Sequence, residues 1–131
     1  IVAGAPTAAI TELCATNDAY LVPIDGDIAA KLMDTCDFYT AYTIPANTYE
    51  GQTADVVTVT VKATLIVSAD ADEETVYNLC KAIFDNTAAI AAENGKGAEL
   101  SIENATSGMS APFHTGAAKY FAEKGTTVPT E

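Results

Sequence analysis

The chain has 131 residues, the length of one domain, and with 49% hydrophobic and 18% charged residues it is expected to fold around a core. Its 18 acidic residues against six lysines give a net charge of −12, which excludes nucleic acid as a partner because affinity for phosphate backbones depends on cations. Arginine is absent, so an anionic ligand would be held by backbone N–H groups, by hydroxyls or by residues outside this chain.

The first predicted elements are a strand that ends within residues 1–4 and a helix over residues 4–16. Pro6 suits a first helical turn. The apolar residues of this helix recur close to every 3.6 positions and are Ala8, Ile10, Leu13 and Cys14.

A second strand and a second helix are predicted next. Residues 20–25 (YLVPID) have the composition of a short strand, and Asp25 is placed to be the N-cap of a helix over residues 25–36. The packing face of this helix is expected to be Ile28, Leu32 and Met33.

Two β-rich segments follow. Residues 37–52 (DFYTAYTIPANTYEGQ) are aromatic and β-leaning, and Pro45 and Gly51 break them. Residues 55–70 carry the clearest strand pattern, which alternates in VTVTVK and becomes continuously apolar at LIV. A strand of this length could pass between two lobes.

The last third of the chain predicts helices. Asp70 is expected to cap one long helix over residues 72–95 that stops at Gly95, with acidic Asp72, Glu73 and Glu74 in its first turn. One apolar stripe is expected to contain Val76, Cys80, Ile83, Phe84, Thr87 and Ile90. A final helix over residues 114–125 would be capped by His114 or Thr115 and ended by Gly125, before a loose tail. Strands that alternate with helices favour a layered α/β domain.

Catalytic and metal motifs are weak. His114 is the single histidine, and a Ser110 and His114 pair can be drawn, but no nucleophile elbow is present and a helix cap explains the histidine better. The acidic cluster that begins at Asp70 lacks the calcium-loop pattern and fits a helix N-terminus. No metal site, cofactor or catalytic residue is therefore predicted.

The three cysteines, Cys14, Cys36 and Cys80, are widely spaced and have neither a CxxC motif nor partnering histidines. This spacing excludes a zinc site and a dithiol redox site. Small buried hydrophobic residues are the favoured interpretation, and one disulfide with a free thiol is the alternative.

Two segments are candidate ligand-binding sites. In GAPT (Gly4, Ala5, Pro6 and Thr7) a strand turns into a helix, which would place free backbone N–H groups at the edge of a sheet where α/β proteins bind ligands. TIPANTYEGQ (residues 43–52) offers Asn47, which tolerates turn conformations, and Tyr49, an aromatic ring with a hydroxyl. For both segments a plain turn remains the alternative.

The order of these blocks carries a family resemblance. GAPTAAITELCAT, LVPIDG, FYTAYTIPANTYEGQ, VVTVTVKATLIVSADADEETVYNLCKAIFDN and SAPFHTGAAKYFAEKG follow one another along the chain. Together they resemble the C-terminal part of the TAXI family, the solute receptors of tripartite ATP-independent periplasmic (TRAP) transporters. The most specific blocks are IPANTYEGQ, VYNLCKAIFDN and PFHTGAAKYF.

The resemblance implies a type II periplasmic-binding-protein-like fold, with a mixed β-sheet, flanking helices and two lobes around a cleft. Residues 1–36 would lie mainly in one lobe, residues 37–69 would form the crossing strands, and residues 70–131 would supply C-terminal helices that pack toward the other lobe. The GAPT turn would face the cleft, where Gly4 would allow close approach of the solute to the backbone. Ala5, Pro6 and Thr7 would form part of the cleft wall and supply N–H or hydroxyl donors. Tyr49 would add an aromatic face.

The implied function is capture of a small organic solute, a carboxylate or an amino acid, for a membrane permease, without enzymatic activity. The receptor would be periplasmic or extracytoplasmic. The chain begins at Ile1 and shows no export signal, so it is expected to be a fragment that lacks an N-terminal lobe. The alternatives are a self-associating structural module and a hydrolase that uses His114.

Overall fold

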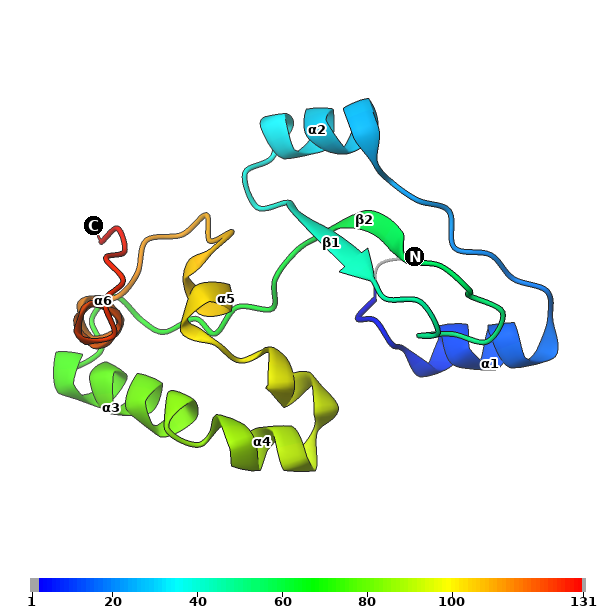
Figure 1. Ribbon diagram of the computed structural model, residues 1–131. Coiled ribbons are helices and arrows are strands. Elements are labelled where there is room, and N and C mark those ends of the chain that lie inside the picture. The colour runs from blue at the N-terminus through cyan, green and yellow to red at the C-terminus, as the bar shows by residue number, and fades with distance from the viewer. Residues whose placement is uncertain (1–2, 131) are drawn as a thin grey trace. The chain divides into compact units, whose positions relative to one another are not determined.

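The computed structural model describes residues 3–130 and divides into two compact units, Ile1–Lys62 and Ala63–Glu131. The described residues form six α-helices, one 3-10 helix and one sheet of two strands (Figure 1). This mixture of helices and a small sheet is compatible with the predicted α/β class. A mixed sheet is not formed by these residues, because their two strands are antiparallel. No helix in the described residues has both the length and the apolar character to span a membrane.

The first unit contains helices α1 (Ala8–Thr16) and α2 (Gly26–Thr35) and a hairpin of strands β1 (Thr40–Ile44) and β2 (Val56–Thr60). The register places Thr40 opposite Thr60 and Ile44 opposite Val56. β1 ends immediately before Pro45, as predicted, since proline has no N–H to donate to a ladder. The hairpin therefore leaves residues 45–55 as its connecting loop.

Both predicted helices of the first unit exist, with corrections. α1 begins two residues after Pro6, and Thr7 is its N-cap, so the placement of Pro6 in the first turn was wrong. Asp25 is the N-cap residue of α2, as predicted, although its side chain makes no capping hydrogen bond. The predicted packing face was partly wrong, because Ile28 is 67% exposed and Ala29 is the buried residue of α2.

Of two further strands predicted in this unit, the one over residues 20–25 was wrong and the one within residues 1–4 lies partly outside the described residues. Residues 1 and 2 lie outside the described residues, and Ala3 and Gly4 are exposed and outside any strand. Residues 20–25 also form no strand. The Ile24 N–H donates to the Val57 carbonyl at 3.0 Å, but a single hydrogen bond does not make a ladder. Strand formation requires a continuous ladder of partners, and an apolar sequence does not by itself provide one.

The long strand predicted over residues 55–70 was also wrong, because β2 ends at Thr60. Residues 61–68 have no regular secondary structure, and the LIV run is exposed, with Leu65 at 67% and Ile66 at 82%. The boundary between the two units follows Lys62, inside this run. The predicted passage between two lobes and the predicted lobe boundaries stay predictions.

The second unit contains α3 (Glu73–Phe84), α4 (Thr87–Glu93), a 3-10 helix η1 (Gly95–Glu99), α5 (Ile102–Thr106) and α6 (Thr115–Glu123). The prediction of one helix over residues 72–95 was wrong. The helix breaks at Asp85 and Asn86. The side-chain amide of Asn86 donates to the Ala82 carbonyl at 2.7 Å, and the backbone of Asn86 leaves the helical conformation, with ψ of 19°. The N-cap is Asp72 and not Asp70, because the Asp72 carboxylate accepts from the Thr75 N–H at 2.8 Å.

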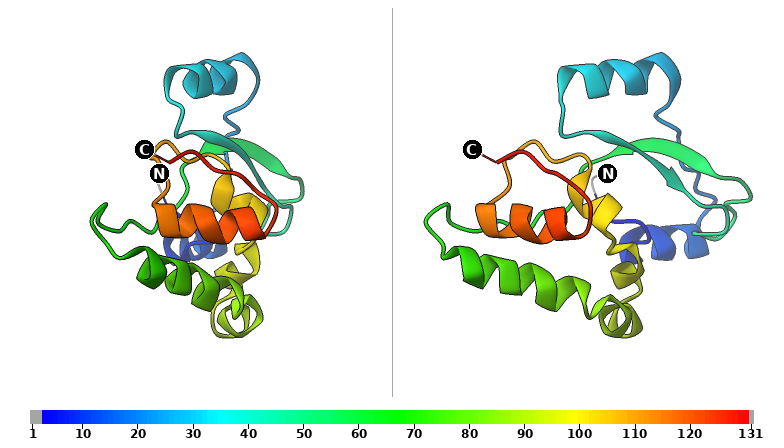
Figure 2. Two further views of the ribbon diagram at one scale, coloured as in Figure 1. Left: turned by 90° about the vertical axis from the view of Figure 1, so that its left-hand side faces the viewer. Right: turned by 60° about the vertical axis from the view of Figure 1, so that its left-hand side comes forward.

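Helices α3 and α6 lie alongside one another and form the centre of this unit (Figure 2). Close approach depends on Gly116, where an added Cβ would lie 2.3 Å from the Glu73 carbonyl oxygen. The predicted apolar stripe is confirmed as the less exposed side of α3 and α4. Val76 is buried, and the other residues of the stripe are half-buried.

An aromatic core joins α6 to the end of the chain. Tyr120, Phe121 and Val128 form the buried cluster, and half-buried rings from α3 and the preceding loop pack against it. The prediction of a loose tail was wrong, because Val128 is buried and the Phe113 N–H donates to the Pro129 carbonyl at 2.9 Å.

Candidate functional site

The loop between β1 and β2 has a fixed conformation. Asn47 adopts a left-handed backbone with φ of +64°, as its turn propensity predicts, and Gly51 has φ of +80°. The Gln52 side chain lies at the centre of the loop, and its amide nitrogen donates to the carbonyls of Ile44, Pro45 and Ala54 at distances between 2.9 and 3.2 Å. Gln52 could not be predicted as a loop-fixing residue, since a glutamine that binds its own loop has no recognisable sequence signal.

Tyr49 connects this loop to the start of α1. Its side chain is only 4% exposed, and its hydroxyl accepts a hydrogen bond from the Thr7 N–H at 3.2 Å. The structure therefore brings together the two segments that the sequence singled out, GAPT and TIPANTYEGQ. The Tyr49 ring itself is not an open aromatic wall, because it is buried.

The N-terminal end of α1 retains free donors. The first amides of a helix have no intrahelical partner, and the Thr7 side chain makes no capping hydrogen bond to them. The Tyr49 hydroxyl accepts from Thr7 and still has its own proton to donate. Backbone amides, the positive end of the helix dipole and a phenolic hydroxyl together suit the acceptor oxygens of a small anionic group.

The other predicted site residues surround this end of α1. Gly4 and Pro6 are exposed, Ala5 and Thr7 are half-buried, and an added Cβ at Gly4 would meet nothing within 4 Å. Gly4 therefore leaves room for close approach of another group to the backbone.

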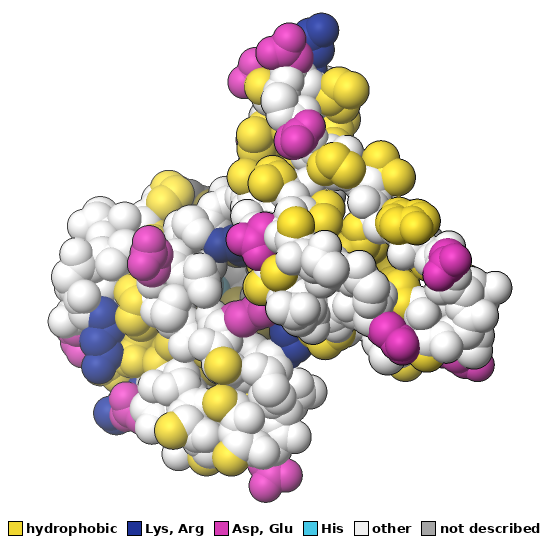
Figure 3. All heavy atoms as spheres, turned by 45° about the vertical axis from the view of Figure 1, so that its right-hand side comes forward, with side chains coloured by type: hydrophobic (Ala, Val, Ile, Leu, Met, Phe, Trp, Pro, Cys, Tyr) yellow, Lys and Arg dark blue, Asp and Glu magenta, His cyan; other side chains and the backbone are white. Residues whose placement is uncertain are grey.

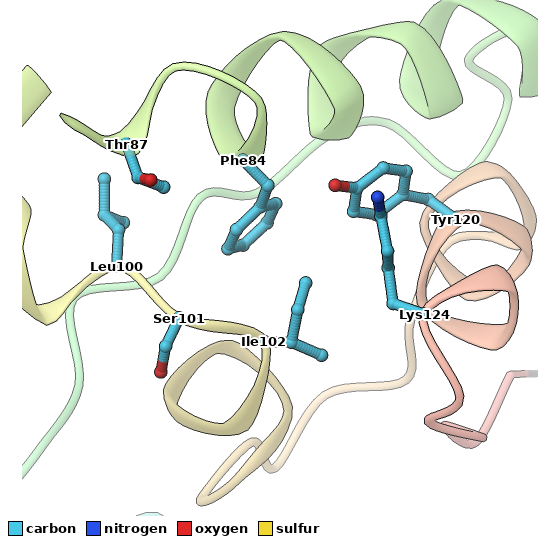
Figure 4. A pocket seen from close by; sticks show the side chains of 7 residues that line it. All are labelled: Phe84, Thr87, Leu100, Ser101, Ile102, Tyr120 and Lys124. Atoms are coloured by element: carbon cyan, nitrogen blue, oxygen red, sulfur yellow. The ribbon is translucent and has the colours of Figure 1, made fainter. Parts of the chain in front are cut away.

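We describe two depressions in residues 3–130, and neither of these is lined by Gly4, Ala5, Pro6, Thr7 or Tyr49. One, of about 380 Å³, lies at the opposite end of α1, where Asp18 and Glu50 contribute to its polar lining. The other, of about 250 Å³, lies in the second unit and has the lining shown in Figure 4. The GAPT segment therefore lies outside both depressions, with Gly4 and Pro6 at the surface.

His114 is a helix cap. Its Nδ1 accepts from the Gly116 N–H at 3.1 Å, and its Nε2 lies 3.0 Å from the Ala71 carbonyl. Since Nδ1 accepts, Nε2 carries the proton of the neutral ring and donates to Ala71. Both ring nitrogens are therefore engaged with backbone groups, and Ser110 is an exposed residue outside any helix. This geometry supports the capping role predicted for His114 and leaves neither nitrogen for activating Ser110.

The acidic residues before and within the first turn of α3 have structural partners. The hydrogen bonds from Thr75 lower the pKa of Asp72 below 3.8, and Glu73 pairs with Lys119 of α6 at 3.3 Å. Within residues 3–130, no cluster of three or more His, Cys, Asp or Glu side chains could hold a metal ion.

All three cysteines are free and half-buried, so the alternative of a disulfide was wrong and the prediction of full burial was too strong. Burial raises the pKa of the Cys80 thiol, which favours the protonated thiol over the thiolate.

The sequence matches the model of the NMT1-like family over residues 1–125, which is nearly the whole chain. Proteins of this family are periplasmic-binding-protein-like, and their role is solute binding. The chain belongs to the NMT1-like family of periplasmic-binding-protein-like proteins.

Proposed function

We propose that this chain is part of an extracytoplasmic solute receptor of the TAXI type, which serves a TRAP transporter. The receptor captures a small organic solute, a carboxylate or an amino acid, and delivers it to the membrane permease subunits. It catalyses no reaction. The family match supports a solute-binding role, and the resemblance of the IPANTYEGQ, VYNLCKAIFDN and PFHTGAAKYF blocks supports the TAXI assignment.

One observation carries the proposal: the hydrogen bond between the Thr7 N–H and the Tyr49 hydroxyl. It fixes the GAPT turn against the hairpin loop and leaves the first amides of α1 available to an oxygen acceptor. A solute carboxylate would accept from these amides and from the Tyr49 hydroxyl. Such contacts need no arginine, and the sequence contains none.

The transport step follows from binding energetics. In the intact receptor, the solute would contact two lobes of a type II periplasmic-binding fold and would therefore bind the closed form more tightly than the open form. Binding then shifts the open and closed populations, and the permease recognises the closed form. The N-terminal lobe that the resemblance implies would supply the remaining contacts to the solute.

The test is ligand-dependent thermal unfolding of the intact receptor against a panel of organic acids and amino acids. A solute at 100 times its dissociation constant should stabilise the receptor by about 2.7 kcal/mol. Tyr49→Phe should reduce this shift at the same solute concentration, because it removes one donor. Tyr20→Phe is the matched control, since Tyr20 is 85% exposed, and it should retain the full shift. The proposal fails if no panel member raises the melting temperature.

A second candidate function is self-association through exposed apolar side chains. Hydrophobic side chains reach the surface in Figure 3, and in the first unit Tyr20 and Val22 are 85% and 81% exposed. Large exposed apolar patches mark interaction sites in soluble proteins. Light scattering across a concentration series should then show a dimer or larger species, and the double variant Tyr20→Ser, Val22→Ser should be monomeric. A monomer at every concentration would exclude this candidate.

A further inference from the structure

The depression in the second unit combines a lysine, a phenolic hydroxyl and apolar side chains. Its volume is about 250 Å³. Its lining comes from the α3–α4 junction, the end of η1, the start of α5 and α6, and consists of Phe84, Thr87, Leu100, Ser101, Ile102, Tyr120 and Lys124 (Figure 4).

Tyr120 supplies the hydroxyl of this depression. The residue is only 2% exposed, and its ring packs against Phe84, with ring centroids 5.7 Å apart, so its position is fixed. In Figure 4 the hydroxyl points from α6 toward the Phe84 side of the depression. The hydroxyl makes no hydrogen bond to any part of the chain that the structure describes. The hydroxyl is not among the buried atoms that lack a partner, so it reaches the surface of the depression, where it can donate to a ligand.

Lys124 supplies the charge. Its ammonium lies 5.3 Å from the centroid of the Tyr120 ring, and Figure 4 shows it beside that ring. Three other lysines, Lys81, Lys96 and Lys119, form ion pairs with carboxylates, whereas Lys124 forms none with the residues between 3 and 130. An ammonium beside a phenolic donor creates a site for a singly charged oxygen anion.

The rest of the lining determines the shape of the ligand. Phe84, Leu100 and Ile102 contribute apolar surface next to these donors, which suits a hydrocarbon chain. The volume lies below the roughly 300–1,000 Å³ of most ligand pockets, so the chain has to be short. A single ammonium without arginine favours a monocarboxylate over a phosphate, which is usually clamped by several cationic groups.

We propose that this depression binds a short-chain aliphatic monocarboxylate, with its carboxylate on Lys124 and Tyr120 and its chain on Phe84, Leu100 and Ile102. The site is separate from the solute site at α1 and does not depend on it.

The first test titrates the full chain with hexanoate and follows backbone amide chemical shifts by NMR. Saturable shifts at Phe84, Leu100 and Ile102 are expected. Acetate, which has the charge without the chain, and hexan-1-ol, which has the chain without the charge, should both bind more weakly. The proposal is overturned if hexanoate causes no saturable shift, if hexan-1-ol binds as tightly, or if the shifts are confined to the start of α1.

The second test uses Tyr120→Phe and Lys124→Met, which keep the ring and the aliphatic stem. Each should weaken hexanoate binding by about tenfold, because each removes a hydrogen bond to a charged group. Lys31→Met, on exposed α2, is the matched control and should leave the affinity unchanged. Since Lys124 also suits the negative end of α6, the melting temperature of each variant is measured beside its affinity. Unchanged affinity in Lys124→Met would overturn the proposal.

Discussion

The Nε2 of His114 lies 3.0 Å from the carbonyl oxygen of Ala71, a residue 43 positions earlier in the chain. The other ring nitrogen caps α6 through the Gly116 N–H. One imidazole thus fixes the start of α6 to the segment that leads into α3. The single histidine of the chain is a structural connection between two helices.

Replacement of His114 should therefore affect stability. His114→Ala removes both hydrogen bonds and should lower the free energy of unfolding by about 1–2 kcal/mol. His114→Asn restores a capping acceptor without the contact to Ala71 and should fall between the alanine variant and the unmodified protein. Urea denaturation followed by circular dichroism measures the difference. An alanine variant as stable as the unmodified protein would contradict the capping role.

The packing of α3 on α6 gives a second prediction. Gly116→Ala would place a Cβ 2.3 Å from the Glu73 carbonyl oxygen and 2.9 Å from the Tyr77 nitrogen, which are backbone atoms and cannot move aside separately. The helices would have to separate, at a cost of about 1–3 kcal/mol. Gly95→Ala is the control, since nothing lies within 4 Å of its added Cβ. Thermal unfolding should show a large loss for Gly116→Ala alone, and equal melting temperatures would refute the close-packing argument.

Three helix ends were predictable from sequence because capping is local, although the predicted Asp70 cap and the first turn at Pro6 were wrong. Asp25 and His114 are N-cap residues, and Gly125, with φ of +87°, follows the end of α6, as predicted. Strands were less predictable. Residues 20–25 and 61–68 have strand-like composition, but a ladder depends on a partner elsewhere in the chain, which local composition cannot show. The break at Asn86 was missed because the apolar periodicity continues across it.

The Asp72 cap predicts a dependence of stability on pH. Hydrogen bonds from Thr75 lower the pKa of Asp72 in the folded state below 3.8, so the charged carboxylate stabilises the fold. This stabilisation is present above the unfolded pKa of about 3.9 and is lost as the pH falls through the folded pKa. The melting temperature of Asp72→Ala should therefore be below that of the unmodified protein above about pH 5, and this difference should shrink as the pH falls through the folded pKa, toward the difference between Asp72→Ala and Asp72→Asn.

Asp72→Asn is the control for this prediction. Asparagine keeps an acceptor oxygen for the Thr75 N–H but does not titrate, so its difference from Asp72→Ala should not change as the carboxylate protonates. A constant difference between Asp72→Ala and the unmodified protein across the whole pH range would show that the charge of Asp72 does not contribute.

The C-terminal tail predicts a stability effect that its sequence did not suggest. Val128 is 9% exposed and packs with Tyr120 and Phe121. Val128→Ala should lower the free energy of unfolding by about 1–2 kcal/mol, because it removes buried methyl groups. Thr127→Ala changes an exposed neighbour and should have little effect. Equal urea midpoints for both variants would show that the tail is not docked.

The candidate site shows what residue types can and cannot predict. The sequence selected GAPT and Tyr49 separately, through glycine, proline and an aromatic hydroxyl. Their meeting through the Thr7 N–H required the hairpin of β1 and β2 to return Tyr49 to the start of α1, and such a contact between positions 42 apart has no local signature. The role of the Tyr120 hydroxyl in the depression was not predictable either, because a tyrosine within a helix has the sequence pattern of an ordinary core residue.

The position of Lys62 as the last residue of the first unit makes it a natural point for limited digestion. Trypsin cleaves after lysine and arginine, and the sequence has six lysines and no arginine. A cut at this one peptide bond would yield two fragments, one with the Thr7 and Tyr49 contact and the other with the Tyr120 depression. Mass spectrometry of such fragments would assign each binding event to its own half of the molecule.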